Sequence, residues 1–82
     1  MMDLICSSLV DSIHTKQSIL DSPALLEAIE SVAQQTIDTL NAGGKVLLCG
    51  NGGSASDAQH LTGEFVSRFR FDRPALAAVA LN

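Results

Sequence analysis

A short apolar run, a glycine-rich turn and an amphipathic segment, in that order, constrain the fold of this chain more than any other feature. Val46 to Cys49 predicts a strand, Gly50-Asn51-Gly52-Gly53-Ser54 a tight turn, and the residues up to Arg68 a helix. Glycine adopts positive φ and lets a ligand approach the backbone, so a strand that enters a helix through glycines often binds an anion. Ser54 is expected to cap the helix, with Asp57 as its partner in a capping pair. The turn therefore predicts a binding site at the N-terminus of the helix.

One face of the expected helix carries a polar side chain at every fourth residue: Ser56, His60, Glu64 and Arg68. The neighbouring face carries a stripe that is expected to be buried, formed by Ala58, Leu61, Thr62, Phe65 and Phe69. His60 and Glu64 are one turn apart, so their Cβ atoms are expected about 5–6 Å from each other. An imidazole and a carboxylate at this spacing can share a substrate or a metal ion such as zinc. They would supply two of about four zinc ligands, and the sequence does not show the others.

The first half of the chain predicts two amphipathic helices, from about Asp3 to Leu20 and from Pro23 to about Leu40. Ser22 can cap the second helix, and the glycines after Asn41 are typical of its end. The stripe of the second helix that is expected to be buried consists of Leu26, Ile29, Val32, Ala33, Ile37 and Leu40. Since 82 residues offer little to cover such stripes, we expect a homo-oligomer with a helical interface. A monomer whose further residues cover the helices is the alternative.

A second apolar run, Ala75 to Leu81, predicts another buried strand. Strand, helix and strand form one right-handed βαβ unit, so the carboxyl ends of both strands meet at one edge. The crevice at that edge would contain residues 51–54 and Asn82. A parallel strand needs further strands beside it and helices on both faces. We therefore expect the front part of a longer α/β protein, with a helical segment at 1–42 and an incomplete α/β domain at 43–82.

Charge and hydropathy argue against several functional classes. Residues 1–41 carry six acidic side chains and one basic, whereas residues 42–82 carry three acidic and four basic. This weak basic character suits a phosphorylated metabolite but not a nucleic acid, which requires a dense basic face. No apolar run approaches the roughly 20 residues of a membrane span, and no basic signal region begins the chain, so a cytoplasmic location is expected. Cys6 and Cys49 are expected to be reduced thiols packed as small apolar residues.

Four segments of the chain occur together in register. They are Cys49-Gly50-Asn51-Gly52-Gly53-Ser54, Asp57-Ala58-Gln59-His60, Gly63-Glu64-Phe65-Val66-Ser67-Arg68-Phe69 and Asp72-Arg73-Pro74. In this combination they resemble the sedoheptulose-7-phosphate isomerases, or phosphoheptose isomerases, of the sugar-isomerase (SIS) domain superfamily. The resemblance is close from Gly43 onward and loose over the first 40 residues. It implies an α/β fold in which N-terminal helices precede the first βαβ unit of a doubly wound parallel sheet, in a protein about twice this length.

The same resemblance implies a function. Such enzymes convert sedoheptulose 7-phosphate to D-glycero-D-manno-heptose 7-phosphate, the first step toward the heptose of the lipopolysaccharide core. It also implies a cytoplasmic homotetramer that binds zinc.

By position, the resemblance assigns roles to individual residues. The substrate-binding residues that it implies are Asn51, Gly52, Gly53, Ser54 and Glu64, with Ser54 helping at the phosphate. His60 and Glu64 would bind zinc together with a Gln and a His outside this chain. Because those ligands and most of the phosphate-binding loop would lie elsewhere, the 82 residues alone are expected to be inactive.

The implied chemistry agrees with the residue types. An aldose–ketose isomerisation requires a base that moves a proton between neighbouring carbons and an electrophile that stabilises the enediolate oxygen. Glu64 suits the base, and a metal ion held partly by His60 suits the electrophile. A carboxylate bound to zinc is a weaker base, so it stays open whether Glu64 acts mainly as ligand or as base. Arg68 is expected in a surface ion pair or an oligomer contact rather than on the substrate.

Three alternatives remain. A non-catalytic member of the same superfamily that binds the replication initiator protein resembles the turn and the Arg-Pro segment but lacks a glutamate at position 64. A dinucleotide-binding domain would use Gly50 to Ala55 as G-x-G-x-x-A, although neutral Asn82 stands where an acid for the ribose is expected. The third is a turn with a purely structural role beside a solvated His60–Glu64 pair. A P-loop is excluded because no Gly-Lys-Ser/Thr follows the turn.

Overall fold

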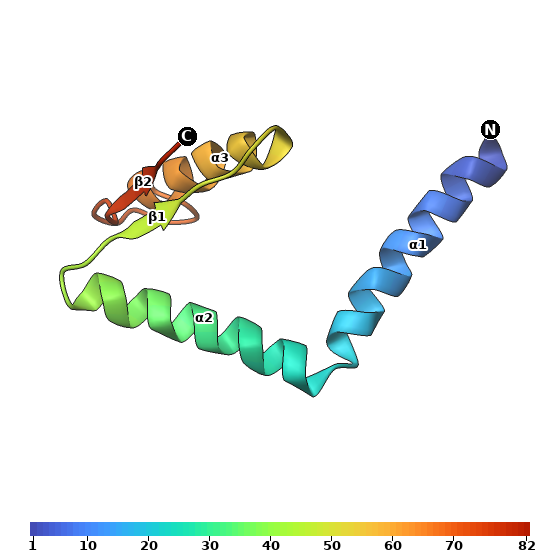
Figure 1. Cartoon of the computed structure of the whole chain (residues 1–82), viewed down its shortest axis with the longest axis horizontal. Coiled ribbons are helices and arrows are strands. Elements are labelled where there is room, and N and C mark those ends of the chain that lie inside the picture. The colour runs from blue at the N-terminus through green and yellow to red at the C-terminus, as the bar shows by residue number, and fades with distance from the viewer. The chain divides into compact units, whose positions relative to one another are not determined.

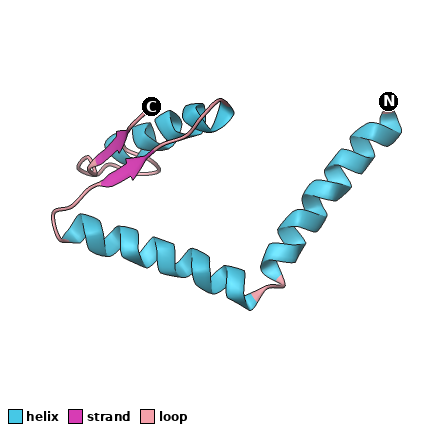
Figure 2. Ribbon diagram, viewed as in Figure 1, coloured by secondary structure: helices cyan, strands magenta, loops and turns pink.

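A computed structural model describes all residues of the chain, Met1–Asn82. The elements follow in the order α1 (Met2–Leu20), α2 (Pro23–Asn41), β1 (Val46–Leu48), α3 (Gly53–Val66) and β2 (Ala78–Ala80) (Figure 1). The predicted class, N-terminal helices followed by a βαβ unit of an α/β fold, is confirmed (Figure 2). Two compact units, Met1–Gln34 and Gln35–Asn82, divide the chain within α2. The expected domain boundary after residue 42 stays a prediction.

Both N-terminal helices begin and end close to the predicted positions. The hydroxyl oxygen of Ser22 accepts a hydrogen bond from the N–H of Leu25 at 3.3 Å, and α2 begins at Pro23. After α2, Gly43 adopts a φ of 83°, and its N–H donates to the carbonyl of Leu40 at 3.2 Å. Local capping therefore sets these helix ends, because side-chain and backbone partners replace the hydrogen bonds that a helix end lacks.

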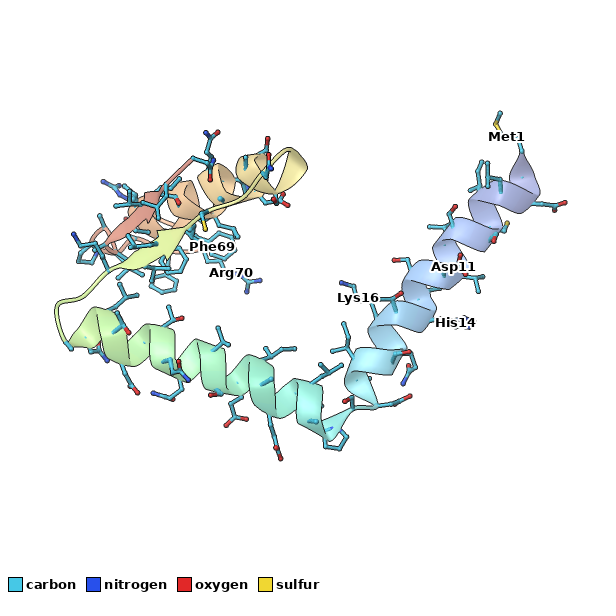
Figure 3. All side chains as sticks on the ribbon, in the orientation of Figure 1. Met1, Asp11, His14, Lys16, Phe69 and Arg70 are labelled. Carbon is cyan, nitrogen blue, oxygen red and sulfur yellow. The ribbon has the colours of Figure 1, made fainter.

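The apolar stripes of α1 and α2 are exposed, contrary to the expectation of burial. No residue of either helix is buried, and on α2 the side chains of Ile29 and Val32 are 57% and 64% exposed. Figure 3 shows Asp11, His14 and Lys16 projecting from α1. An amphipathic helix buries its stripe only by packing against another element, so these stripes remain available for contacts with further protein.

The two strands are parallel, with Val46, Leu47 and Leu48 paired to Ala78, Val79 and Ala80. The second strand is shorter than the predicted run from Ala75 to Leu81, and it is covered on one face only. Side chains alternate accordingly: Leu47 and Val79 are exposed, while their neighbours on both strands are half-buried. This pattern arises because α3 packs against both strands and the sheet has no helix on its other face.

The central helix is shorter than predicted. It ends at Val66, so Arg68 and Phe69 lie beyond it rather than on its faces. Arg68 instead pairs with Asp72 at 3.5 Å, an exposed ion pair of the kind expected for this arginine. The expected buried stripe is only partly formed: Ala58 is buried, Phe65 and Thr62 are half-buried, and Leu61 and Phe69 are exposed. After Val66 the N–H of Leu76 and the guanidinium group of Arg73 bind the carbonyl of Phe65 near the helix end.

Two further expectations concern the cysteines and membranes. Cys6 and Cys49 are free thiols, as expected, but both are exposed rather than packed, since neither helix α1 nor the end of β1 is covered. None of the three helices combines the length and the apolar character that crossing a bilayer requires.

Gly50 lies where the end of β1 passes over the start of α3. A Cβ atom at this position would clash with the carbonyl group of Ser54 and would lie 2.7 Å from the amide nitrogen of Ala55. Both groups belong to the backbone of α3, so relief of the clash would require the helix to shift. Only glycine fits this position.

We therefore expect Gly50→Ala to lower the free energy of unfolding of the full-length protein by about 3 kcal/mol, the upper part of the range for overpacking. Gly63→Ala is the matched control, because a Cβ at Gly63 meets nothing within 4 Å and alanine favours a helix interior by about 1 kcal/mol. Urea unfolding of both variants measures the difference. Equal stability of Gly50→Ala and the unmodified protein would contradict the close contact.

Candidate functional site

The side chains of Ser54 and Asn82 close the bend between β1 and α3. The hydroxyl group of Ser54 accepts a hydrogen bond from the N–H of Asn51 and donates to the carbonyl of Asn51, each at 2.8 Å. Asn82, which follows β2, accepts from the N–H of Gly50 at 3.0 Å and donates to the carbonyl of Ala55 at 3.2 Å. The predicted meeting of the turn with Asn82 beyond the carboxyl ends of both strands is thus confirmed.

Ser54 does not cap α3 in the predicted way. The N-cap residue is Gly52, with a φ of 59°, and no side chain caps the helix. The positive φ of Gly52 starts the helix two residues earlier than a cap at Ser54 would, and the Ser54 hydroxyl closes the turn instead. Its single proton is directed to the carbonyl of Asn51, so donation to a phosphate would require that hydrogen bond to break.

The N–H groups of Gly52 and Gly53 have no hydrogen-bond partner in the chain, whereas their neighbours on both sides are paired. Gly52 precedes α3 and Gly53 is its first residue. The helix dipole contributes partial positive charge at this end. The positions that their Cβ atoms would occupy have no neighbour within 4 Å. Two adjacent, accessible N–H donors at a helix N-terminus suit an anionic oxygen.

His60 and Glu64 lie side by side on α3. The Nε2 atom of His60 is 3.3 Å from Oε1 of Glu64, and the two side chains are 76% and 35% exposed. The expectation that they share one face is therefore confirmed. His60 and Glu64 are seven and eleven residues after Gly53, so the pair lies about 10 to 17 Å from the bend along the helix axis. A molecule that reached both the bend and the pair would have to be extended.

The spacing of this pair fits two ligands of one zinc ion. With zinc–nitrogen and zinc–oxygen bonds of about 2.1 Å, two tetrahedral ligand atoms lie about 3.4 Å apart, close to the observed 3.3 Å. No group of three or more His, Cys, Asp or Glu side chains in Met1–Asn82 could hold a metal ion. The chain therefore provides at most half of a tetrahedral ligand set.

Arg73 binds the C-terminal end of the same helix. Its guanidinium group donates to the carbonyl of Glu64 at 2.7 Å and to the carbonyl of Phe65 at 2.9 Å. Arg73 had no predicted role of its own. A signal was present, because a basic residue shortly after a helix is a common partner for its last carbonyl groups. A shallow apolar hollow of about 190 Å³ lies beside these contacts, lined by Glu64, Phe65, Phe69, Arg73 and Leu76.

The sequence of this chain is similar to those of several known proteins. The family model described as SIS domain matches residues 12–82. The phosphoheptose isomerase of Aneurinibacillus thermoaerophilus is 54% identical over the whole chain, which covers 41% of that protein. The phosphoheptose isomerase of Burkholderia pseudomallei (strain 1710b) is 52% identical over 95% of the chain and 40% of its own length, and that of Clostridium acetobutylicum is 48% identical over 100% and 42%. The chain thus spans about two fifths of the length of these curated relatives.

The bend makes a testable prediction at Asn82. Asn82→Asp in the full-length protein keeps the acceptor for the N–H of Gly50 but loses the donor to Ala55 and adds a negative charge beside the free N–H groups. Repulsion should weaken the binding of an anion such as inorganic phosphate about tenfold, or about 1.4 kcal/mol. Isothermal titration calorimetry measures the affinity. Asn41→Asp, which adds the same charge at the exposed end of α2, should leave it unchanged; equal effects of both variants would contradict an anion site at the bend.

Proposed function

We propose a function from the premise that this chain belongs to the SIS domain family. As part of a protein of its relatives' length, it contributes to an isomerase that converts sedoheptulose 7-phosphate to D-glycero-D-manno-heptose 7-phosphate. The observation that supports this proposal is the His60–Glu64 pair, 3.3 Å apart on the helix that begins at the glycine bend. The names of the relatives support the same substrate class.

The reaction moves one proton between neighbouring carbon atoms. In the proposed mechanism, the carboxylate of Glu64 removes a proton from C1 of the ketose, and the electrons of that C–H bond form the C1–C2 double bond of an enediolate. The oxygen at C2 gains a proton and the hydroxyl group at C1 loses one. Return of the carbon-bound proton to C2 then gives the aldose. Glu64 suits this task because its side chain is 35% exposed, so a sugar can reach the carboxylate.

His60 and Glu64 would hold a zinc ion, with the remaining ligands from outside Met1–Asn82. When bound, zinc would supply an electrophile that polarises the oxygens of the sugar. His60 would fix the side of α3 on which the sugar lies, since its imidazole contacts the carboxylate directly. Coordination to a metal ion would lower the basicity of the Glu64 carboxylate. The more strongly Glu64 acted as a ligand, the less readily it would accept a proton from the sugar.

The glycine bend would bind the substrate at a second point. The N–H groups of Gly52 and Gly53 are free to donate to an anionic or hydroxyl oxygen, and Asn51 and Ser54 keep these groups in position by closing the turn. The separation of about 10 to 17 Å between the bend and the pair along α3 suits an extended phosphorylated sugar better than a small ion. The proposal includes a cytoplasmic location and a role in forming the heptose of the lipopolysaccharide core, as the family resemblance implies.

Glu64→Gln tests the proposed chemistry directly. The substitution keeps the size of the side chain but removes the base and a charged ligand, so we expect kcat for sedoheptulose 7-phosphate to fall by at least about 10³-fold. A chelator should also reduce turnover by the unmodified protein. Glu27→Gln, on the exposed surface of α2, is the control. Undiminished turnover by Glu64→Gln would overturn the assignment, and tight binding of the replication initiator without isomerisation would favour the non-catalytic alternative.

We also propose that the protein is a homo-oligomer, a tetramer in agreement with the family resemblance, and that the apolar stripe of α2 forms part of its interface. A hollow of about 300 Å³ lies at the edge of this stripe. It is lined by Ile29 and Val32 of the stripe and by Leu25 and Ala28 beside it. Exposed apolar surface of this kind is typical of contacts with other protein.

A charge within this stripe should disrupt the assembly. We expect Ile29→Lys to lower the molar mass of the full-length protein in solution to that of a smaller species, because a lysine at this position would have to be desolvated in the interface. Glu27→Lys, at an exposed position on the opposite side of the helix from Ile29, should leave the assembly intact. Light scattering coupled to size-exclusion chromatography measures both. Unchanged mass for Ile29→Lys would place the interface elsewhere.

A further inference from the structure

We propose that Arg73 is a positioning residue: its guanidinium group fixes the last turn of α3 and thereby the place of the Glu64 carboxylate. This inference rests on the proposed function, in which Glu64 acts on the substrate. Arg73 itself does not touch the reacting atoms in this proposal, and its effect is transmitted through the backbone of Glu64.

The contacts of Arg73 are short and are directed at one helix end. Nη2 donates to the carbonyl of Glu64 at 2.7 Å, and Nη1 donates to the carbonyls of Phe65 at 2.9 Å and Pro74 at 3.2 Å. Hydrogen bonds from a charged donor are stronger than those between neutral groups. The fork of the guanidinium group allows one side chain to bind two successive carbonyl groups of the helix.

The last turn of α3 depends on these bonds. A helix leaves its final four carbonyl groups without partners inside the helix. The carbonyl of Gly63 accepts from the N–H of Ser67, and that of Phe65 accepts from the N–H of Leu76 as well as from Arg73, each backbone bond at 2.9 Å. The carbonyl of Glu64 has Arg73 as its donor. The positive charge of Arg73 also complements the negative end of the helix dipole.

Burial distinguishes this arginine from its neighbours. Glu64 and Arg73 are the two charged residues of the chain that are not exposed. Arg68 and Arg70 in the same loop are exposed; the first pairs with Asp72, and the second lies 5.5 Å from the centre of the Phe69 ring (Figure 3). Arg73 forms no ion pair with a carboxylate of this chain, so its charge is directed to the backbone carbonyls.

The position of Glu64 makes this support important for chemistry. Glu64 lies two residues before the end of α3, and helix ends fray. A shift of the Glu64 backbone would move the carboxylate relative to His60, and a misplacement of about 1 Å at a catalytic group can lower a rate about 10²-fold. A lysine at position 73 could bind one of the two carbonyls but could not bridge them.

Three variants of the full-length protein test this inference. For Arg73→Ala we expect kcat for sedoheptulose 7-phosphate to fall about 10- to 100-fold, with KM changed less than about threefold. Arg73→Lys should recover part of the loss, because it restores one charged donor. Arg70→Ala removes an exposed arginine from the same loop and should keep kcat within about twofold. Amide hydrogen exchange at Ser67 and Leu76, whose N–H groups bond to the same helix end, should be faster in Arg73→Ala and unchanged in Arg70→Ala.

The outcomes separate this inference from the proposed function. If the unmodified protein isomerises the sugar but folded Arg73→Ala retains kcat within twofold, the inference fails and the function stands. A raised KM with unchanged kcat would also overturn it, because that result indicates a substrate contact. If the unmodified protein does not isomerise the sugar, the proposed function fails and the catalytic role of Arg73 fails with it. Should Arg73→Ala not fold, the inference is decided by Arg73→Lys, in which unchanged kcat and unchanged amide exchange would overturn it.

Discussion

The close contact between the end of β1 and the first turn of α3 determines the arrangement of the candidate site. Gly50 brings the strand so near to the carbonyl of Ser54 that no side chain fits between them. The strand therefore enters the helix within a few residues, and the positive φ of Gly52 completes the change of direction. As a result, the free N–H groups stand at the open edge of the sheet, and the polar face of α3 continues from them.

The helix that carries the proposed catalytic pair is supported at both ends by residues that follow it. Asn82 binds the first turn through the carbonyl of Ala55, and Arg73 binds the last turn through the carbonyls of Glu64 and Phe65. Asn82 reaches the bend only because β2 pairs in parallel with β1. The geometry of the site thus depends on the sheet, although the sheet contributes no catalytic side chain.

Local features of the sequence predict much of this structure, and the errors arise where distant residues compete. Ser22 with Pro23 sets the start of α2, and helical spacing alone places His60 beside Glu64, because these effects act within one turn. Periodicity extended α3 through Phe69, but the chain leaves the helix at Val66, where Arg73 and Leu76 take the carbonyl of Phe65. Ser54 was predicted as the cap because the sequence does not show that Gly52 is the N-cap residue. Nor does it show that the Ser54 hydroxyl donates to the carbonyl of Asn51.

The sheet and the proposed zinc site are each open on one side, and the two open sides differ. The uncovered face of the sheet exposes Leu47 and Val79, whereas parallel sheets are usually covered on both faces. The His60–Glu64 pair offers two ligands, and no third lies within reach. Further ligands of the proposed zinc ion would have to approach the exposed side of α3, whereas residues that cover Leu47 would have to approach the opposite face of the sheet. A single added helix cannot do both, so the proposed zinc site and the core of the sheet would be completed by separate elements.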